Sequence, residues 1–215
     1  MIEAIILAGG MGKRMRPVTE DIPKCLVPLN GRPLLDYQLE RLRKYGVRKI
    51  IIACGYKWEM IRHIYGNSVL YSVEEEPLGT GGAVKKAMEL VDGEEFLVIN
   101  ADDLSDADLE EFVKTGSNAT AVARFHSSFG IVEIAGGKIT EFREKPLLPY
   151  WANMGMHLLN KKVPFKDKCS LEYDILPLLA KQGLLKVYQH HGFWRTANTI
   201  KELEELEAFL KEKTL

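Results

Sequence analysis

Three cations behind a glycine-rich stretch are the first residues of the chain whose types and spacing could do chemistry. An apolar run at residues 5–7 ends in the stretch 9–12, which contains three glycines, and Lys13, Arg14 and Arg16 follow it. Glycines let backbone N–H groups approach an anion closely, and the cations neutralise its charge. The sequence therefore predicts a polyphosphate-binding loop after a buried strand.

Two common phosphate loops do not fit this stretch. The dinucleotide fingerprint needs glycine at its first, third and sixth positions, and although Gly10 and Gly12 fit, Met15 stands at the sixth. The string Gly-x-x-x-x-Gly-Lys-Ser/Thr of the P-loop does not occur here. The string that is present is Leu-Ala-Gly-Gly-x-Gly-x-Arg-x-x-Pro, followed by Pro-Lys at residues 23–24.

This string resembles the opening of the sugar-1-phosphate nucleotidyltransferases, apart from Lys13 in place of threonine and Met15 in place of leucine. The later motifs of that family have counterparts in the same order, so the resemblance covers almost the whole chain. They are Pro-Leu-Gly-Thr at 77–80, Asn-Ala-Asp at 100–102, Glu-Lys-Pro at 144–146, Asn-Met-Gly at 153–155 and Glu-x-Asp-x-Leu-Pro at 172–177.

The resemblance assigns roles to individual residues. Arg14 is expected to neutralise the β- and γ-phosphates, Lys24 to reach the α-phosphate and Asp102 to bind Mg²⁺ as the cofactor. Those three are the expected catalytic residues. The residues expected to bind the nucleotide are Leu7, Gly9, Gly10, Gly12, Lys13, Pro77, Gly79 and Thr80, and those expected to bind the sugar phosphate are Gly130, Glu144, Lys145 and Asn153.

One departure from the family pattern concerns the second metal ligand. Relatives carry an aspartate after a tryptophan, in one of two spacings, whereas residues 194–199 read Trp-Arg-Thr-Ala-Asn-Thr. The two spacings place Thr196 or Asn198 at the aspartate position, and we take Asn198 as the expected second ligand. An amide oxygen can coordinate Mg²⁺ but adds no charge, so weaker metal binding is expected.

The implied reaction joins a nucleoside triphosphate and a sugar 1-phosphate to give a nucleotide sugar and pyrophosphate. The segment 71–86 matches most closely the branches that use GTP with mannose or heptose phosphates, while uridylyl-, thymidylyl- and cytidylyltransferases remain alternatives. A non-catalytic nucleotide-sugar sensor is the rival from another class, because the second carboxylate is missing.

Ordinary structural roles compete with several of these assignments. Asp102 could cap a helix without binding a metal, and Glu144 with Lys145 could form a surface ion pair. Asn153 could do no more than satisfy the backbone of a loop.

Composition narrows the possible partners. The 215 residues carry 29 Lys and Arg against 30 Asp and Glu. The net charge of −1 therefore gives no overall electrostatic field that would attract nucleic acid or a membrane surface. The 3 cysteines form neither a disulfide framework nor a zinc pattern. No signal peptide or long apolar run is apparent, so a cytoplasmic protein is expected. A homo-oligomer is an alternative that the sequence leaves open.

Alternating strand-like and helix-like segments should position these residues. The expected fold is α/β, a single Rossmann-like domain over 1–215 with a mostly parallel central sheet, flanking helices and a β-hairpin insertion for sugar binding. The approximate halves are 1–115 for the nucleotide and 116–215 for the sugar phosphate. Strands are expected near 3–8, 48–54, 69–73, 96–100, 119–125, 130–134, 138–143, 154–159 and 185–189, and helices near 34–45, 58–64, 81–91, 106–114, 171–182 and 200–213. Ligands bind at the carboxyl ends of such strands, which would bring residues 9–14 and Asp102 to one crevice.

Overall fold

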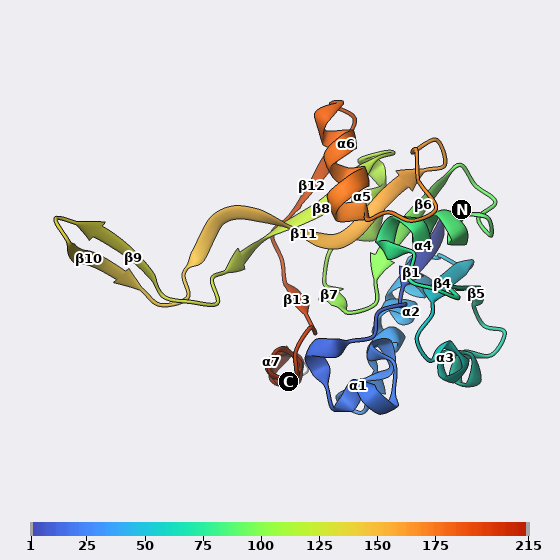
Figure 1. Ribbon diagram of the computed structural model, residues 1–215, viewed down its shortest axis with the longest axis horizontal. Helices are drawn as coiled ribbons and strands as arrows, with labels where there is room; N and C mark the ends of the chain where they lie inside the picture. Colours follow the sequence, from blue (N-terminus) through green and yellow to red (C-terminus); the bar gives the residue numbers. More distant parts are fainter. Residues whose placement is uncertain (1, 214–215) are drawn as a thin grey trace.

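The computed structural model describes residues 2–213, and Figure 1 shows a body of mixed helices and strands from which a two-stranded arm projects. A seven-stranded sheet with the order β12-β8-β11-β6-β1-β4-β5 forms the centre. Its strands are β1 (Glu3–Leu7), β4 (Ile50–Cys54), β5 (Leu70–Val73), β6 (Glu95–Asn100), β8 (Ala119–His126), β11 (Leu147–Asn160) and β12 (Lys186–His190).

The sheet is mostly parallel, as expected. β1 lies parallel to both β4 and β6, and its Ile6 stands opposite Ile52 on one side and Ile99 on the other. β11 is the exception, because it runs antiparallel to both β6 and β8. The chain moves outward from β1 through β4 to β5 and then returns to β6 on the other side of β1, so the topological switch point lies between β1 and β6.

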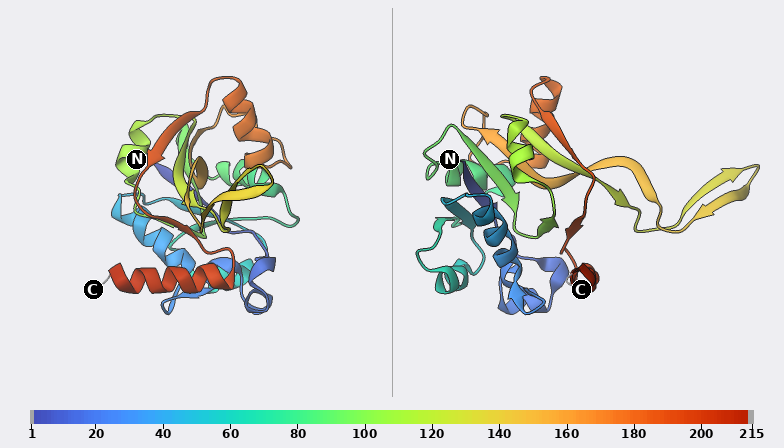
Figure 2. Two further views of the ribbon diagram at one scale, coloured as in Figure 1. Left: turned by 90° about the vertical axis from the view of Figure 1, so that its left-hand side faces the viewer. Right: turned by 180° about the vertical axis from the view of Figure 1, so that it is seen from behind.

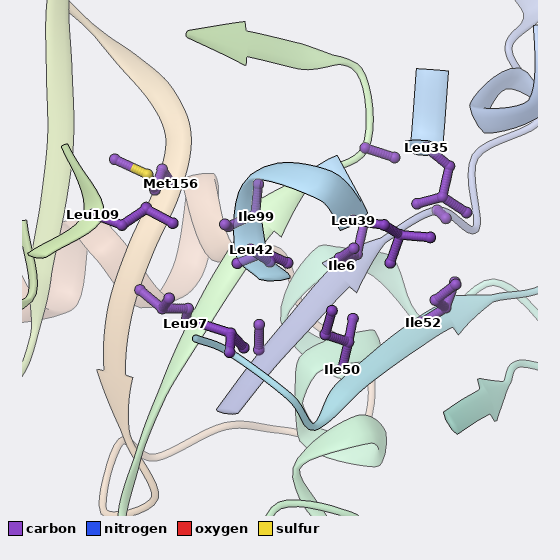
Figure 3. Close-up of a cluster of buried hydrophobic side chains, with 14 of the residues drawn as sticks. Ile6, Leu35, Leu39, Leu42, Ile50, Ile52, Leu97, Ile99, Leu109 and Met156 are labelled. Carbon is purple, nitrogen blue, oxygen red and sulfur yellow. The ribbon is translucent and has the colours of Figure 1, made fainter. Parts of the chain in front are cut away.

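Helices cover both faces of this sheet. One face carries α2 (Leu34–Lys44), α3 (Trp58–Tyr65) and α5 (Leu109–Lys114), and the other carries α4 (Gly79–Met88), a π-helical turn (Leu171–Ile175) and α6 (Leu176–Lys181). Figure 3 shows the first core, in which Leu35, Leu39 and Leu42 of α2 lie over Ile6 and Ile52 of the sheet. Buried strands of this kind are continuous apolar runs because both faces are covered.

A third, smaller core supports the site. The C-terminal helix α7 (Ile200–Lys213) buries Leu206 together with Met15 of the glycine-rich segment and Ala197, which lies just before the helix. The remaining elements are α1 (Val18–Asp21), single 3₁₀ turns at Lys13–Met15 and Lys24–Leu26, and the short strands β2 (Pro28–Leu29), β3 (Arg32–Pro33), β7 (Asp103–Ser105) and β13 (Trp194–Thr196).

The expected hairpin is present as β9 (Ile131–Ala135) and β10 (Lys138–Arg143), which pair antiparallel with each other around Gly136 and Gly137. The right-hand view in Figure 2 shows this arm projecting away from the seven-stranded sheet. No helix among residues 2–213 is long and apolar enough to cross a membrane.

Candidate active site

A cavity of about 710 Å³ lies at the carboxyl ends of β1 and β6, on the switch point. Every residue expected to bind the nucleotide lines it, and so do Arg14, Lys24, Asp102 and Asn198. The eight residues expected to bind the nucleotide are Leu7, Gly9, Gly10, Gly12, Lys13, Pro77, Gly79 and Thr80. The structure therefore brings the glycine-rich loop, the cations and the aspartate to one cleft.

The glycine-rich loop is held in a conformation that requires Gly12. Its φ of 60° lies in the left-handed region, and the hydroxyl of Thr19 donates a hydrogen bond of 2.8 Å to its carbonyl oxygen. A Cβ at this position would lie 2.8 Å from Cγ2 of Thr19 and 3.1 Å from Cβ of Lys24. The loop thus packs directly on the stem of Lys24 and fixes where that side chain starts.

A chain of side-chain contacts runs through the cleft from Asp102 to Lys24, Asn198 and Arg14. The ammonium of Lys24 forms an ion pair with the carboxylate of Asp102 and donates a hydrogen bond of 2.9 Å to Oδ1 of Asn198. The same Oδ1 accepts a hydrogen bond of 2.8 Å from Nη2 of Arg14. The side chains of Lys24 and Asp102 are only 14% and 22% exposed, so solvent screens this pair less than a surface pair.

Asn198, and not Thr196, faces the cleft. The hydroxyl of Thr196 donates to the carboxylate of Glu202, which also accepts the backbone N–H of Asn198 at 2.8 Å. The hydroxyl of Thr199 in turn accepts the backbone N–H of Glu202. This arrangement is close to a capping box at the start of α7, and it fixes the backbone that presents Asn198.

The neighbouring Asp103 does not line the cleft. It is buried, and its carboxylate accepts a hydrogen bond of 2.8 Å from Nδ2 of Asn100. Burial, together with the charge of Asp102, raises the pKa of Asp103 to about 7. Successive residues at the start of a strand point to opposite sides, and the two carboxylates separate accordingly.

The oxygen atoms in the cleft suit a divalent ion that also binds substrate phosphates. Among the described residues no group of three or more His, Cys, Asp or Glu could hold a metal alone. However, Oδ2 of Asp102 and Oδ1 of Asn198 both contact the ammonium of Lys24, so they already converge on a single cation. One carboxylate with one amide oxygen fits a hard divalent ion that keeps several waters and takes other ligands from phosphates.

Glu74 lines the cleft together with Pro77 and Gly79. Its carboxylate accepts the backbone N–H of Leu78 at 3.0 Å, and burial raises the pKa of Glu74. The hydroxyl of Thr80 is engaged elsewhere, because it donates to Glu172 and accepts the N–H of Leu171. It thereby ties the start of α4 to the π-helical turn.

The residues expected to bind the sugar phosphate lie outside this cavity. Glu144 and Lys145 are exposed at the end of the arm that joins the body, and Gly130 lies beside them, where a Cβ would meet the ring of Phe142 and the carboxylate of Glu144. Asn153 accepts the N–H of Gly155 at 2.9 Å within β11. These four assignments remain predictions.

Sequence reasoning missed several residues of the cleft. Gly55 and Tyr56 follow β4 and line it, and Cys25 follows Lys24. The switch-point rule could have indicated Gly55 and Tyr56, because β4 is the parallel neighbour of β1. Burial raises the pKa of the Cys25 thiol to about 12, so this cysteine is no nucleophile.

Comparison with known proteins gives one consistent result. The family model described as nucleotidyl transferase matches residues 3–213. A D-glycero-alpha-D-manno-heptose 1-phosphate guanylyltransferase of Aneurinibacillus thermoaerophilus is 36% identical over 192 residues, covering 81% of this chain and 84% of its own length. Mannose-1-phosphate guanyltransferase beta-B of Xenopus laevis is 33% identical over 216 residues, and these cover 90% of this chain but 60% of that protein.

Solved structures agree with the fold. HddC from Yersinia pseudotuberculosis complexed with GMP-PN superposes with a TM-score of 0.75 at 28% identity, covering 98% of this chain and 100% of that one. A putative glucose-1-phosphate thymidylyltransferase from Bacillus anthracis, in complex with a sucrose, gives a TM-score of 0.79 at 25% identity, covering 99% and 96%. The Rossmann-like fold expected from the sequence is confirmed. With its glycine-rich loop and its cations assembled at one switch point, the chain belongs to the nucleotidyl transferase family and is a sugar-1-phosphate nucleotidyltransferase.

Proposed function

We propose that this enzyme transfers GMP from GTP to a sugar 1-phosphate of the mannose or heptose class. The observation that carries the proposal is the convergence of Arg14, Lys24, Asp102 and Asn198 under the glycine-rich loop. The names of the relatives, which are guanylyltransferases for heptose and mannose 1-phosphates, support the choice of substrates.

In this reaction a phosphate oxygen of the sugar 1-phosphate attacks the α-phosphorus of GTP. The bond between that phosphorus and the bridging oxygen breaks, and pyrophosphate leaves with the electron pair. The attacking oxygen is already ionised at neutral pH, so no general base is needed. The main obstacles are the repulsion between two anions and their in-line alignment.

The side chains of the cleft meet these obstacles as follows. Arg14 neutralises the β- and γ-phosphates and so stabilises the leaving group, and Lys24 exchanges its contact with Asp102 for one with the α-phosphate. Asp102 and Asn198 would hold Mg²⁺, which neutralises phosphate charge when bound. Glu144 and Lys145 are proposed to bind the sugar and its phosphate.

Glu74 gives a physical reason for guanine. The base presents N1–H and N2–H groups side by side, and a carboxylate accepts both, whereas uracil and thymine offer one donor between two acceptors. The backbone N–H of Leu78 donates to the carboxylate of Glu74 and so holds it in place in the cleft. We propose that Glu74 binds this edge of guanine.

Release of pyrophosphate tests the proposal. GTP, ATP, UTP, CTP and dTTP are each combined with mannose 1-phosphate, a heptose 1-phosphate and glucose 1-phosphate in the presence of Mg²⁺. Release should be fastest with GTP and one of the first two sugars. Faster release with dTTP or UTP would overturn the assignment of the base, and binding without release from any pair would favour the sensor.

A comparison of GTP with inosine triphosphate tests whether Glu74 recognises the base, independently of whether the transfer reaction occurs. Inosine lacks the N2 amino group, so the wild type should prefer GTP to ITP, and Glu74→Gln should reduce that preference. An unchanged ratio of the two rates in a variant that is still active would exclude Glu74 from base recognition.

A further inference from the structure

The short helix α1 follows the glycine-rich loop and has little apolar surface of its own to hold it. Thr19 is its buried residue, whereas Val18 is 39% exposed. A segment with so few buried apolar contacts opens locally at low cost unless hydrogen bonds fix it. The hydrogen bonds made by α1 therefore determine whether the loop before it keeps one conformation.

The sequence leaves a carbonyl oxygen of α1 without a donor from the helix itself. The last carbonyl groups of any helix have no partner within it. In a longer helix the carbonyl of Thr19 would accept from the N–H of residue 23, but that residue is Pro23, which has no N–H. A donor for this oxygen has to come from another part of the chain.

The loop after β4 supplies that donor. The hydroxyl of Tyr56 lies 3.1 Å from the carbonyl oxygen of Thr19 and 3.2 Å from that of Glu20, so one O–H is shared between two acceptors. The ammonium of Lys57 donates to the same carbonyl of Glu20 and lies 5.5 Å from the centre of the Tyr56 ring. Tyr56 also lines the nucleotide cleft. The loop after β4 thus joins α1 to a wall of the cleft.

Thr19 continues this connection toward Arg14. Its hydroxyl donates a hydrogen bond of 2.8 Å to the carbonyl oxygen of Gly12, and the N–H of Met15 donates one of 2.8 Å to the same oxygen. The second bond closes the single 3₁₀ turn that carries Arg14. A carbonyl oxygen has two lone pairs, so it can accept from α1 and from this turn at once. Hydrogen bonds therefore connect Tyr56, by way of α1, to the turn that carries Arg14.

We propose that Tyr56 is a positioning residue of the transfer reaction. Its hydroxyl fixes α1 against the cleft wall, and α1 in turn fixes the turn that presents Arg14 to the β- and γ-phosphates. A loop that is ordered before the triphosphate binds spares the reaction the entropic cost of ordering it. This role rests on that of Arg14 in the proposed function, but not on which base or sugar the enzyme uses.

The variant Tyr56→Phe removes the hydroxyl and keeps the ring in the cleft wall. Pyrophosphate release is measured with the pair of nucleoside triphosphate and sugar 1-phosphate that the wild type uses fastest. The kcat/KM for the triphosphate should fall about 5- to 10-fold, the loss expected for one hydrogen bond, while the KM for the sugar 1-phosphate stays unchanged. Tyr71→Phe is the matched control, because that hydroxyl donates 2.9 Å to the carbonyl of Gly66 and does not line the cleft. It should keep the wild-type values.

Variants of Thr19 test whether the connection runs through α1. Thr19→Val loses the hydroxyl and should lower kcat/KM for the triphosphate as Tyr56→Phe does, whereas Thr19→Ser keeps the hydroxyl and should retain most of the wild-type value. The double variant Tyr56→Phe with Thr19→Val should be little slower than the slower single variant, because groups that act through one connection are not additive.

Hydrogen exchange follows the same connection without turnover. The amides of residues 13–22 should exchange faster in Tyr56→Phe than in the wild type, while the amides of β6 exchange equally in both. Wild-type kcat/KM and wild-type exchange in Tyr56→Phe would overturn the proposal. So would a double variant whose loss is the product of the two single losses, or an equal rise of the KM for the sugar 1-phosphate, which would reduce Tyr56 to general stability.

Failure of the proposed function gives a different result. A wild type that releases no pyrophosphate from any pair would contradict the transfer reaction itself. Faster exchange of residues 13–22 in Tyr56→Phe would then still support the hold of Tyr56 on α1, and equal exchange would still overturn it.

Discussion

Oδ1 of Asn198 accepts a hydrogen bond of 2.8 Å from Nη2 of Arg14, across 184 positions of the sequence. Because Lys24 donates to the same oxygen, one amide orders two cations of the cleft, Arg14 and Lys24. An aspartate at this place would add a charge, whereas the amide holds the cations without neutralising them. Asn198 therefore leaves both cations free to exchange this contact for substrate phosphates.

The first test concerns the negative charge that Asn198 lacks in comparison with an aspartate. We expect Asn198→Asp to lower the Mg²⁺ concentration for half-maximal rate, because a second carboxylate strengthens binding of a hard cation. Titration of pyrophosphate release with Mg²⁺ measures this requirement. Asn67→Asp, at an exposed position of the loop after α3, is the control. An unaltered requirement would count against Asn198 as a metal ligand.

The second test concerns Asp102. Asp102→Asn should reduce turnover by roughly 10²–10³-fold, the usual loss when one charge-stabilising group is removed from an active site. The amide can still accept a hydrogen bond from Lys24, so the thermal unfolding midpoint should change little. Asp92→Asn removes an exposed carboxylate and should leave turnover unchanged. Turnover of Asp102→Asn equal to that of the wild type would exclude a catalytic role.

The third test concerns the support behind Asn198. Glu202→Ala removes the acceptor for the N–H of Asn198 and for the hydroxyl of Thr196. We expect a loss of about 1 kcal/mol in the free energy of unfolding and a lower kcat, because Arg14 and Lys24 lose their common anchor. Glu202→Gln keeps an oxygen acceptor and should restore most of both quantities. Loss of stability with an unchanged kcat would limit Glu202 to a structural role.

The fourth test uses the buried His157, whose Nδ1 lies 2.9 Å from the hydroxyl of Thr120. Burial lowers the pKa of His157 from 6.5 to about 4. The unfolded chain binds a proton at this residue between these pH values and the folded chain does not, so stability decreases as the pH falls through this window. The loss should approach about 3 kcal/mol at pH 4.

Chemical denaturation at several pH values measures that loss. The slope of unfolding free energy against pH between 4 and 6.5 should flatten in His157→Gln and stay unchanged in His63→Gln, which alters an exposed histidine. An equal slope in all three proteins would show that other groups govern the acid response.

The core strands and long helices could be predicted from sequence because their apolar periodicity is strong. The runs around Ile6, Ile52 and Ile99 have no polar interruption, and the spacing of Leu35, Leu39 and Leu42 is helical. Short elements were not predicted: β7 and β13 are only three residues long each, and their pairing joins Asp103 to Thr196, far apart in the chain. Such strands depend on tertiary contacts rather than on any local pattern.

The candidate site likewise contains features that the sequence could predict and features that it could not. Motif order predicted which segments line the cleft, because the glycine-rich loop follows a strand and the segment at 77–80 opens a helix. Spacing alone could not decide between Thr196 and Asn198, since that choice is made by the hydrogen bonds of Glu202. Nor could it predict that the hairpin before Glu144 and Lys145 projects from the body, because the alternation of side chains along a strand does not set the direction of a hairpin.

The place of Asn198 in the chain has a consequence for biosynthesis. The ribosome has made Arg14, Lys24 and Asp102 once it has translated codon 102. Asn198, whose side-chain oxygen orders Arg14 and Lys24, is added almost a hundred codons later. A nascent or prematurely terminated polypeptide ending before that point would carry the glycine-rich loop and both cations without their common acceptor. Competence for catalysis should thus switch on late during translation, after the greater part of the sheet has emerged from the ribosome.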